Sequence, residues 1–110
     1  MTDTGASPPV ADRRLRVLVF AASLGNDSVN AVLAHLAAEH ASRHGAVVDL
    51  ASMRDFDAPS YDSDIEARGD IPAGALELNR RLTANDAFVI ASPEYNGSMP
   101  GLLKNAIDWA

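Results

Sequence analysis

The chain has 110 residues, of which 47% are hydrophobic and 22% are charged, and this composition is typical of one globular domain. It contains no cysteine, which excludes disulfides and cysteine-ligated metal sites. A formal net charge of -6 has the wrong sign for a protein that binds nucleic acid or anionic lipid through charge. No apolar run approaches the roughly 18 residues of a membrane span, and no secretory signal pattern opens the chain. We therefore expect a cytoplasmic protein without nucleic-acid or membrane partners.

The first 14 residues differ in composition from the rest of the chain. They mix Ser, Thr, Gly, Pro and scattered charge without a periodic apolar face, so they bury too little apolar surface to offset the entropy of ordering. We predict a disordered tail at 1–14 and one folded unit at 15–110.

Apolar spacing after the tail predicts strands and helices in alternation. Residues 15–22 are apolar almost without interruption, which favours a central strand that is covered on both faces in a parallel sheet. A polar turn at 23–27 precedes a helix that extends to Gly45, a residue type common just past helix ends. The helical spacing is carried by Val29, Val32, Leu33, Leu36, Ala37 and His40.

The rest of the chain repeats this order. Residues 46–53 predict a second strand, 54–70 a long loop, and 87–92 a third buried strand. Helices are expected to open at Ile71-Pro72 and at Pro100, because proline is favoured in the first helical turn. The first of these has Leu76, Leu78 or Asn79, and Leu82 on its inner side, and the second contains Leu103, Ala106, Ile107 and Trp109.

This alternation predicts an α/β fold with a doubly wound parallel sheet. Polar turns at 23–30 and 93–100 follow the first and third strands. Because ligands of such sheets bind at the carboxyl ends of the strands, we expect the function to lie on these two turns.

The first turn is suited to bind an anion. Its backbone amides and the positive end of the following helix dipole point to the same place, and Ser23, Ser28 and Asn30 add side-chain donors. The turn matches neither the nucleoside triphosphate motif G-x-x-x-x-G-K-[ST] nor the dinucleotide motif G-x-G-x-x-G. In the alternative interpretation, Ser28 or Asn30 only caps the helix and Gly25 only forms the turn.

The second turn is suited to hold a planar heteroaromatic ring. Pro, Asn and Gly fix its backbone path, and Tyr95 offers a flat apolar face with a polar tip. The backbone amides of Asn96 and Gly97 are candidate donors to ring carbonyl or nitrogen atoms. In the alternative interpretation, this segment is only a tight turn with Tyr95 on the surface.

Two segments resemble a known family. Residues 92–109, SPEYNGSMPGLLKNAIDW, are similar to the signature of the NADPH-dependent FMN reductases, a flavodoxin-like family that includes quinone, chromate and azo-dye reductases. The first turn resembles the phosphate loop of that family, G-S-x-R-x-x-S-x-N, with Ser23, Ser28 and Asn30 in register. The resemblance covers nearly all of the chain after the tail.

The resemblance implies an FMN cofactor, a co-substrate that is NADPH or NADH, and hydride transfer through FMN to a flavin, a quinone or a similar small-molecule electron acceptor. It implies neither a catalytic side chain nor a metal, since the flavin itself carries the electrons. Glu94 is therefore not assigned as a catalytic carboxylate. By this resemblance the phosphate and ribityl chain are bound by Ser23, Leu24, Asn26, Ser28 and Asn30, and the ring is bound by Pro93, Glu94, Tyr95, Asn96 and Gly97.

Three departures from the family pattern matter. The usual glycine is Ala22 and the usual arginine is Gly25, so the phosphate loop lacks its cation and we expect weaker FMN binding. The flavodoxin-like order 2-1-3-4-5 also needs two more strands, so we expect a fold truncated after the third strand and the helix that follows. The third strand is then an open edge. The alternative function is a non-enzymatic or inactive truncated fragment that binds flavin or another subunit.

Other polar residues are expected to be structural. The three histidines are assigned to the helix surface, Lys104 and Asp108 to an i, i+4 ion pair, and the carboxylates of residues 62, 64 and 66 to solvent. Leu102, Ile107 and Trp109 give the last helix more apolar surface than one core-facing stripe needs. We therefore expect a homo-oligomer formed through the helix at 100–110.

Overall fold

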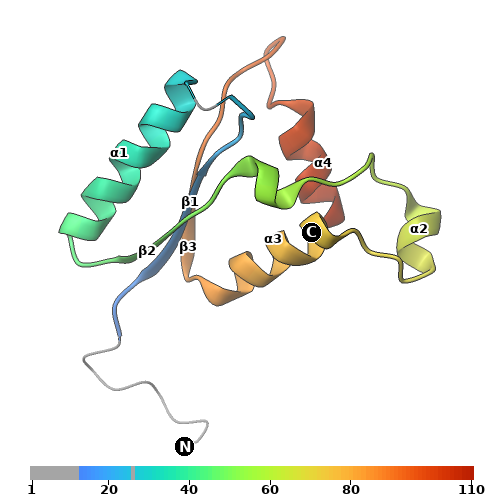
Figure 1. Ribbon diagram of the computed structural model, residues 1–110, viewed down its shortest axis with the longest axis horizontal. Coiled ribbons are helices and arrows are strands. Elements are labelled where there is room, and N and C mark those ends of the chain that lie inside the picture. The colour runs from blue at the N-terminus through green and yellow to red at the C-terminus, as the bar shows by residue number, and fades with distance from the viewer. Residues whose placement is uncertain (1–12, 26) are drawn as a thin grey trace, which may run out of the picture.

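The described part of the chain forms three strands and five helical segments. The computed structural model describes residues 13–25 and 27–110 (Figure 1). The predicted tail therefore lies outside the described residues, except for Arg13 and Arg14. The elements are β1 (Arg16–Ala21), α1 (Val29–Arg43), β2 (Val47–Leu50), the 3-10 helix η2 (Met53–Phe56), α2 (Ser63–Ala67), α3 (Ala73–Ala84), β3 (Ala87–Ala91) and α4 (Gly101–Trp109).

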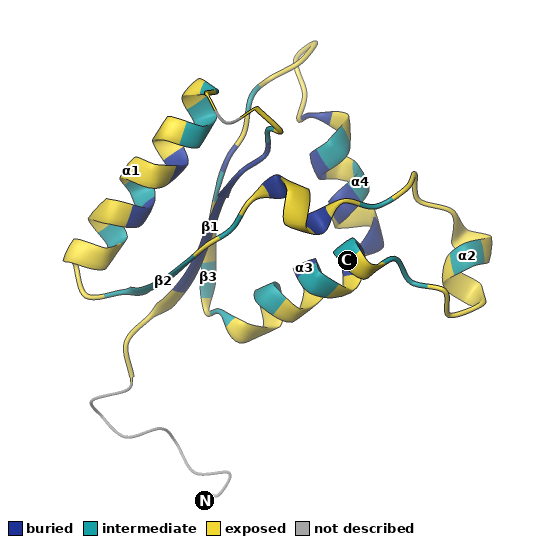
Figure 2. Cartoon of the chain, in the orientation of Figure 1, coloured by how far each residue is buried: buried dark blue, intermediate teal, exposed yellow. Residues whose placement is uncertain are grey.

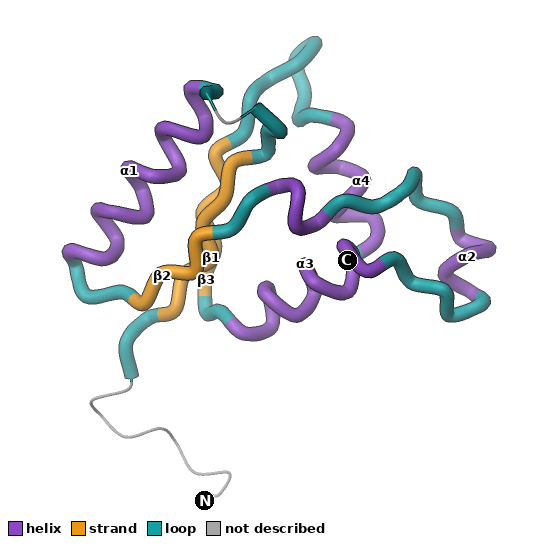
Figure 3. Tube along the Cα trace, viewed as in Figure 1, coloured by secondary structure: helices purple, strands orange, loops and turns teal. Residues whose placement is uncertain are grey.

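The strands form one parallel sheet in the order β2-β1-β3, as the resemblance to the flavodoxin-like family implies (Figure 3). The central strand β1 is buried from Val17 to Ala21. Its alternate side chains point to opposite faces, so each face contributes to a separate core. The prediction of a central strand covered on both faces is confirmed. Helix α1 covers one face, and η2, α3 and α4 cover the other (Figure 1).

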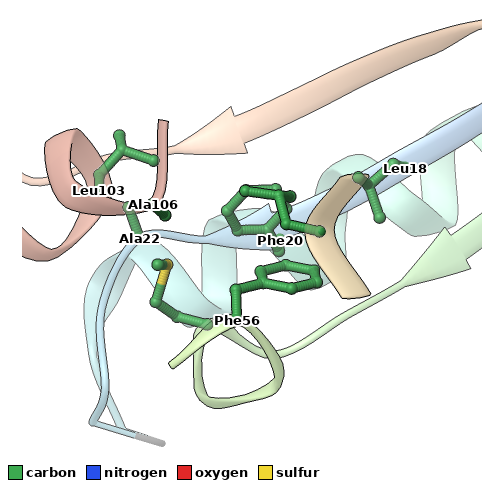
Figure 4. Packing of buried hydrophobic residues seen from close by; sticks show 8 residues of the cluster. Leu18, Phe20, Ala22, Phe56, Leu103 and Ala106 are labelled. Carbon is green, nitrogen blue, oxygen red and sulfur yellow. The ribbon is translucent and has the colours of Figure 1, made fainter. Parts of the chain in front are cut away.

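Large side chains fill one of the two cores. Phe20 of β1 and Phe56 of η2 meet edge to face, with ring centroids 5.2 Å apart (Figure 4). This is the preferred geometry of an aromatic pair. The remaining members of this cluster are Leu18, Ala22, Met53, Leu78, Leu103 and Ala106.

The opposite core is built from small side chains, and this decides how α1 lies on the sheet. The buried residues of α1 are Ala34 and Ala38, whereas Val29 at its start is 81% exposed. Alanine lets a helix axis approach the sheet closely, so the alanine face packs inward and the larger side chains remain exposed. Figure 2 shows buried and exposed positions alternating along α1. The predicted helix is confirmed, but the large residues behind its spacing, Val29, Val32, Leu33 and Leu36, are not buried.

Helix α3 also differs from its predicted packing. Leu78 is buried and Leu82 packs against the core, as expected, but Leu76 is 57% exposed and Ala75 is buried instead. The first turn of α3 passes so close to Asp57 that a Cβ on Gly74 would overlap the Asp57 backbone. Only glycine allows this contact.

Replacement of Gly74 by alanine should therefore destabilise the fold. We expect Gly74→Ala to lower the free energy of unfolding by about 1–3 kcal/mol, because the backbone must shift to relieve the overlap. Gly101→Ala is the matched control, since a Cβ there meets nothing within 4 Å. Urea unfolding measures both variants, and equal stability of the two would contradict this interpretation.

The segment at 54–70, predicted as a loop, contains α2 and all of η2 except Met53, and it is fixed to α4. Asn105 accepts a hydrogen bond from the Tyr61 N–H at 2.7 Å and donates to the Pro59 carbonyl at 3.0 Å. The Trp109 indole N–H donates to the same carbonyl at 2.7 Å, and its ring packs edge to face on Tyr61. Trp109 is buried. The sequence predicts Trp109 on an oligomer surface. That prediction is wrong, because the 54–70 segment covers the indole ring.

The acidic residues of this segment also have structural roles. Asp62 caps α2 by accepting from the Asp64 N–H, and Glu66 accepts from the Tyr61 hydroxyl. The predicted Lys104–Asp108 pair is present at 2.6 Å. Within the described ranges, no group of three or more His, Asp or Glu side chains is placed to hold a metal ion. None of the helices in those ranges has the length and hydropathy needed to cross a bilayer.

One ion-pair network, which the sequence did not reveal, connects β2 to α3. Arg81 donates to both carboxylate oxygens of Asp49 at 2.8 Å and to Glu77 at 2.8 Å, and its guanidinium lies over the Phe56 ring. The hydrogen bond from Arg81 lowers the pKa of Asp49. Hydrogen bonds from Arg80 and then Arg81 lower the pKa of Glu77 to about 2.

Acid should therefore weaken the fold through these two carboxylates. Because their folded pKa values are depressed, the stabilisation is fully present above their unfolded values and is lost as pH falls through the folded ones. We expect the melting temperature to fall steadily from roughly pH 5 to pH 2. Arg81→Met should lower it at neutral pH and flatten the acid decline, whereas Arg43→Met, which removes an exposed pair with Glu39, should do neither. An unchanged acid profile in Arg81→Met would contradict the assignment.

Candidate flavin site

The two polar turns lie side by side at one end of the sheet. Strands β1 and β3 are adjacent and parallel, with Ala21 opposite Ala91. One residue further on, the Ala22 N–H donates to the Ala91 carbonyl at 2.8 Å. Both strands leave the sheet there, so the turns that follow β1 and β3 emerge next to each other (Figure 1).

Ser28 caps α1 in the first turn. Its Oγ accepts from the Ala31 N–H at 3.0 Å, as the alternative interpretation of this residue predicts. A hydroxyl that accepts still has its own proton to donate, so the cap does not exclude a second partner. Ser23 and Asn30 are half-buried, and Asn26 lies outside the described residues.

Backbone donors are available in the same turn. No hydrogen bond within the described part of the chain uses the N–H groups of Ser23, Leu24 or Gly25. A Cβ on Gly25 would meet nothing within 4 Å, so the space beside it is open. The turn therefore presents unpaired amides at the amino end of a 15-residue helix, an arrangement that favours an anion.

A cavity of about 270 Å³ adjoins the first turn. Ser23, Leu24 and Gly25 line one side of it, and the residues that follow β2, among them Ser52, line another. Arg54, which the sequence did not single out, donates from its Nη2 to the Leu24 carbonyl at 3.1 Å. Arg54 lies 30 residues along the chain from Leu24, outside every motif, so only the fold could reveal this contact.

The second turn is tight and rigid. Tyr95 and Ser98 exchange two backbone hydrogen bonds of 2.9 and 3.1 Å. Asn96 and Gly97 between them have φ values of 52° and 78°, which Asn and Gly tolerate better than other residues. The N–H groups of both residues are without a partner among the described residues.

The side chains of this turn are mostly accessible. Pro93 is half-buried, Glu94 is exposed, and the Tyr95 ring is 57% exposed. A rigid backbone with free amides and an accessible aromatic face is compatible with both interpretations of this turn, a plain surface turn and a platform for a planar ring. The neighbouring turn, with its amides at the start of α1, favours the second.

The sequence model of the family described as NADPH-dependent FMN reductase matches residues 15–110. The chain belongs to this family. The matched range spans every element of the fold and both turns of the candidate site.

Curated relatives support the assignment to this family. A 2-hydroxy-1,4-benzoquinone reductase of Burkholderia is 38% identical over 98 residues, with 87% of this chain and 50% of that protein covered. A quinone reductase of Escherichia coli is 38% identical over 96 residues, with the same coverage. The chain thus spans about half the length of these relatives.

Solved structures agree with the fold. FerB, a flavoenzyme NAD(P)H:(acceptor) oxidoreductase from Paracoccus denitrificans, superposes with a TM-score of 0.72 at 36% identity, covering 87% of this chain and 50% of that one. The predicted flavodoxin-like sheet is therefore confirmed for the strands present.

Proposed function

We propose that this chain of the FMN reductase family binds FMN across its two adjacent turns and contributes to NAD(P)H-dependent reduction of small electron acceptors. The observation that carries the proposal is the pairing of β1 with β3, which brings both turns to the same end of the sheet. A mononucleotide has a phosphate at one end and a ring at the other, so it needs an anion site and an aromatic platform close together.

The donors of the first turn suit a phosphate monoester. We assign the phosphate and ribityl chain to Ser23, Leu24, Ser28 and Asn30, with Asn26 included from the sequence. The unpaired amides and the helix dipole favour the anion, and the Ser28 hydroxyl has a proton left after capping. None of these residues is acidic, although Asp27 is their neighbour in the sequence.

The second turn suits the isoalloxazine ring. We assign ring contacts to Pro93, Glu94, Tyr95, Asn96 and Gly97. Amides held by a rigid turn need no reorganisation when negative charge develops on the ring, so they stabilise the reduced form. FMN, when bound, supplies the hydride-accepting and electron-passing chemistry, and the chain supplies position and polarity. No side chain is assigned as an acid or a base, and Glu94 is a ring contact only.

The acceptor class follows from the relatives. The Burkholderia and Escherichia coli relatives are named for quinones, so we propose a quinone or a similar small molecule, reduced by hydride from NADPH or NADH. A homo-oligomer through α4 remains part of the proposal. It would use the exposed Ile107 rather than the buried Trp109. The cytoplasmic location stays a prediction of the sequence.

A second candidate function is favoured by the apolar groove beside β3. Phe88 is 56% exposed there, and a cavity of about 370 Å³ is lined by Phe88, Leu82, Ile107 and other apolar side chains. Within the described sheet, the outer edge of β3 has no neighbouring strand. These features favour a flavin-binding segment that becomes catalytically active only when further polypeptide packs against this groove.

Titration with FMN and with NAD(P)H separates the two candidates. We expect FMN fluorescence to be quenched on binding, and NAD(P)H to be oxidised with a quinone acceptor. Quenching without NAD(P)H oxidation would support the second candidate. An absence of FMN binding by folded protein would contradict both.

A change at Ser28 tests the phosphate assignment separately from the helix cap. Ser28→Asp keeps a good N-cap, so the melting temperature should be maintained, while its carboxylate repels phosphate. We expect FMN affinity to fall and riboflavin affinity to stay the same, because riboflavin has no phosphate. Ser28→Ala should instead lower stability by about 1 kcal/mol through loss of the cap. Wild-type FMN affinity in Ser28→Asp would show that Ser28 is only a cap.

A further inference from the structure

The proposed phosphate turn has no cation of its own. Residues 23–30 contain no Lys or Arg, and Asp27 adds a negative charge. A phosphate monoester carries nearly two negative charges at neutral pH, and amides alone leave much of that charge uncompensated. A cation from another part of the fold would meet this need.

Arg54 is placed to supply that charge. Its Nη2 donates to the Leu24 carbonyl at 3.1 Å, which holds the guanidinium against the phosphate turn. Its backbone is fixed as well, because the Arg54 N–H donates to Ser52 Oγ and Asp55 completes the capping box of η2. The cation is thus attached to the turn at one end and to a short rigid helix at the other.

No described residue neutralises the charge of Arg54. No carboxylate in residues 13–25 or 27–110 forms an ion pair with it, and its side chain is exposed. A guanidinium has five N–H donors, and the contact with Leu24 uses one. Arg81 is different, because Asp49 and Glu77 already occupy its donors. Among the contacts described, Arg54 is the cationic side chain that hydrogen-bonds to the phosphate turn.

We propose that Arg54 is the phosphate-binding cation of the FMN site and takes the role of the arginine that is absent at Gly25. This inference rests on the proposed function, since it concerns how the same site holds its cofactor. The guanidinium binds the phosphate through charge-assisted hydrogen bonds while Leu24 holds it in place. The alternative is a purely structural contact, in which Arg54 only fixes the turn.

Paired titrations with FMN and riboflavin distinguish the two roles. Arg54→Gln keeps an amide donor for the Leu24 carbonyl and removes the charge. We expect it to weaken FMN binding about tenfold or more, with riboflavin affinity unchanged. Arg54→Lys should retain part of the FMN affinity. Arg43→Gln is the matched control, because it makes the same change in net charge at the far end of α1 and should leave both affinities unchanged.

A rescue variant makes the test more specific. Gly25 has open space beside it and a φ outside the left-handed region, so Arg fits there without strain. We expect Gly25→Arg in the Arg54→Gln background to restore FMN affinity. Wild-type FMN affinity should also fall more steeply with salt than that of Arg54→Gln.

The other outcomes are equally decisive. Equal losses of FMN and riboflavin in Arg54→Gln, or no loss of FMN, would overturn the role in phosphate binding. Failure of the wild-type chain to bind either flavin would instead refute the proposed function. Circular dichroism of each variant confirms that the comparison is made on folded protein.

Discussion

The parallel pairing of β1 with β3 is the constraint on which both the core and the site depend. The two turns begin about 70 residues apart in the sequence, and local structure cannot bring them together. The hydrogen bond from the Ala22 N–H to the Ala91 carbonyl closes the pairing at the end where the two turns begin. Both alanines are buried, so this end of the sheet is held by packing on its two faces. The positions of the turns are therefore set by the hydrophobic core.

Periodicity predicted the elements because it reflects local burial. The nearly unbroken apolar run at 15–22 and the prolines just before α3 and α4, Pro72 and Pro100, act through short-range preferences of the backbone. The order β2-β1-β3 is long-range information, and it comes from the family resemblance. The packing choices were harder to predict. Helix α1 has two apolar faces, and which one turns inward depends on how closely its axis approaches the sheet. The alanine face allows the closer approach, and the sequence pattern does not measure that distance.

Long-range polar contacts were the other limit. Trp109 has the appearance of surplus apolar surface until the 54–70 segment is seen to cover it and accept its N–H. Asn105 lies in the 92–109 stretch that resembles the family signature, yet its amide fixes the 54–70 segment to α4. Such roles depend on where a loop of irregular composition lies in space. For the candidate site, the sequence predicted the two turns, and the fold added Arg54.

The different surroundings of Arg54 and Arg81 explain why a cation can be structural in one place and available in another. Arg81 is mostly buried, and a buried guanidinium must have its charge and donors satisfied within the protein. The carboxylates of Asp49 and Glu77 do this, and the ion pair between Asp49 and Arg81 joins β2 to α3. Arg54 is exposed, so water satisfies its unused donors until an anion replaces it. An anion at the phosphate turn would then gain a fixed positive charge without breaking any ion pair among the described residues. That difference in desolvation makes the exposed arginine the one suited to hold a cofactor.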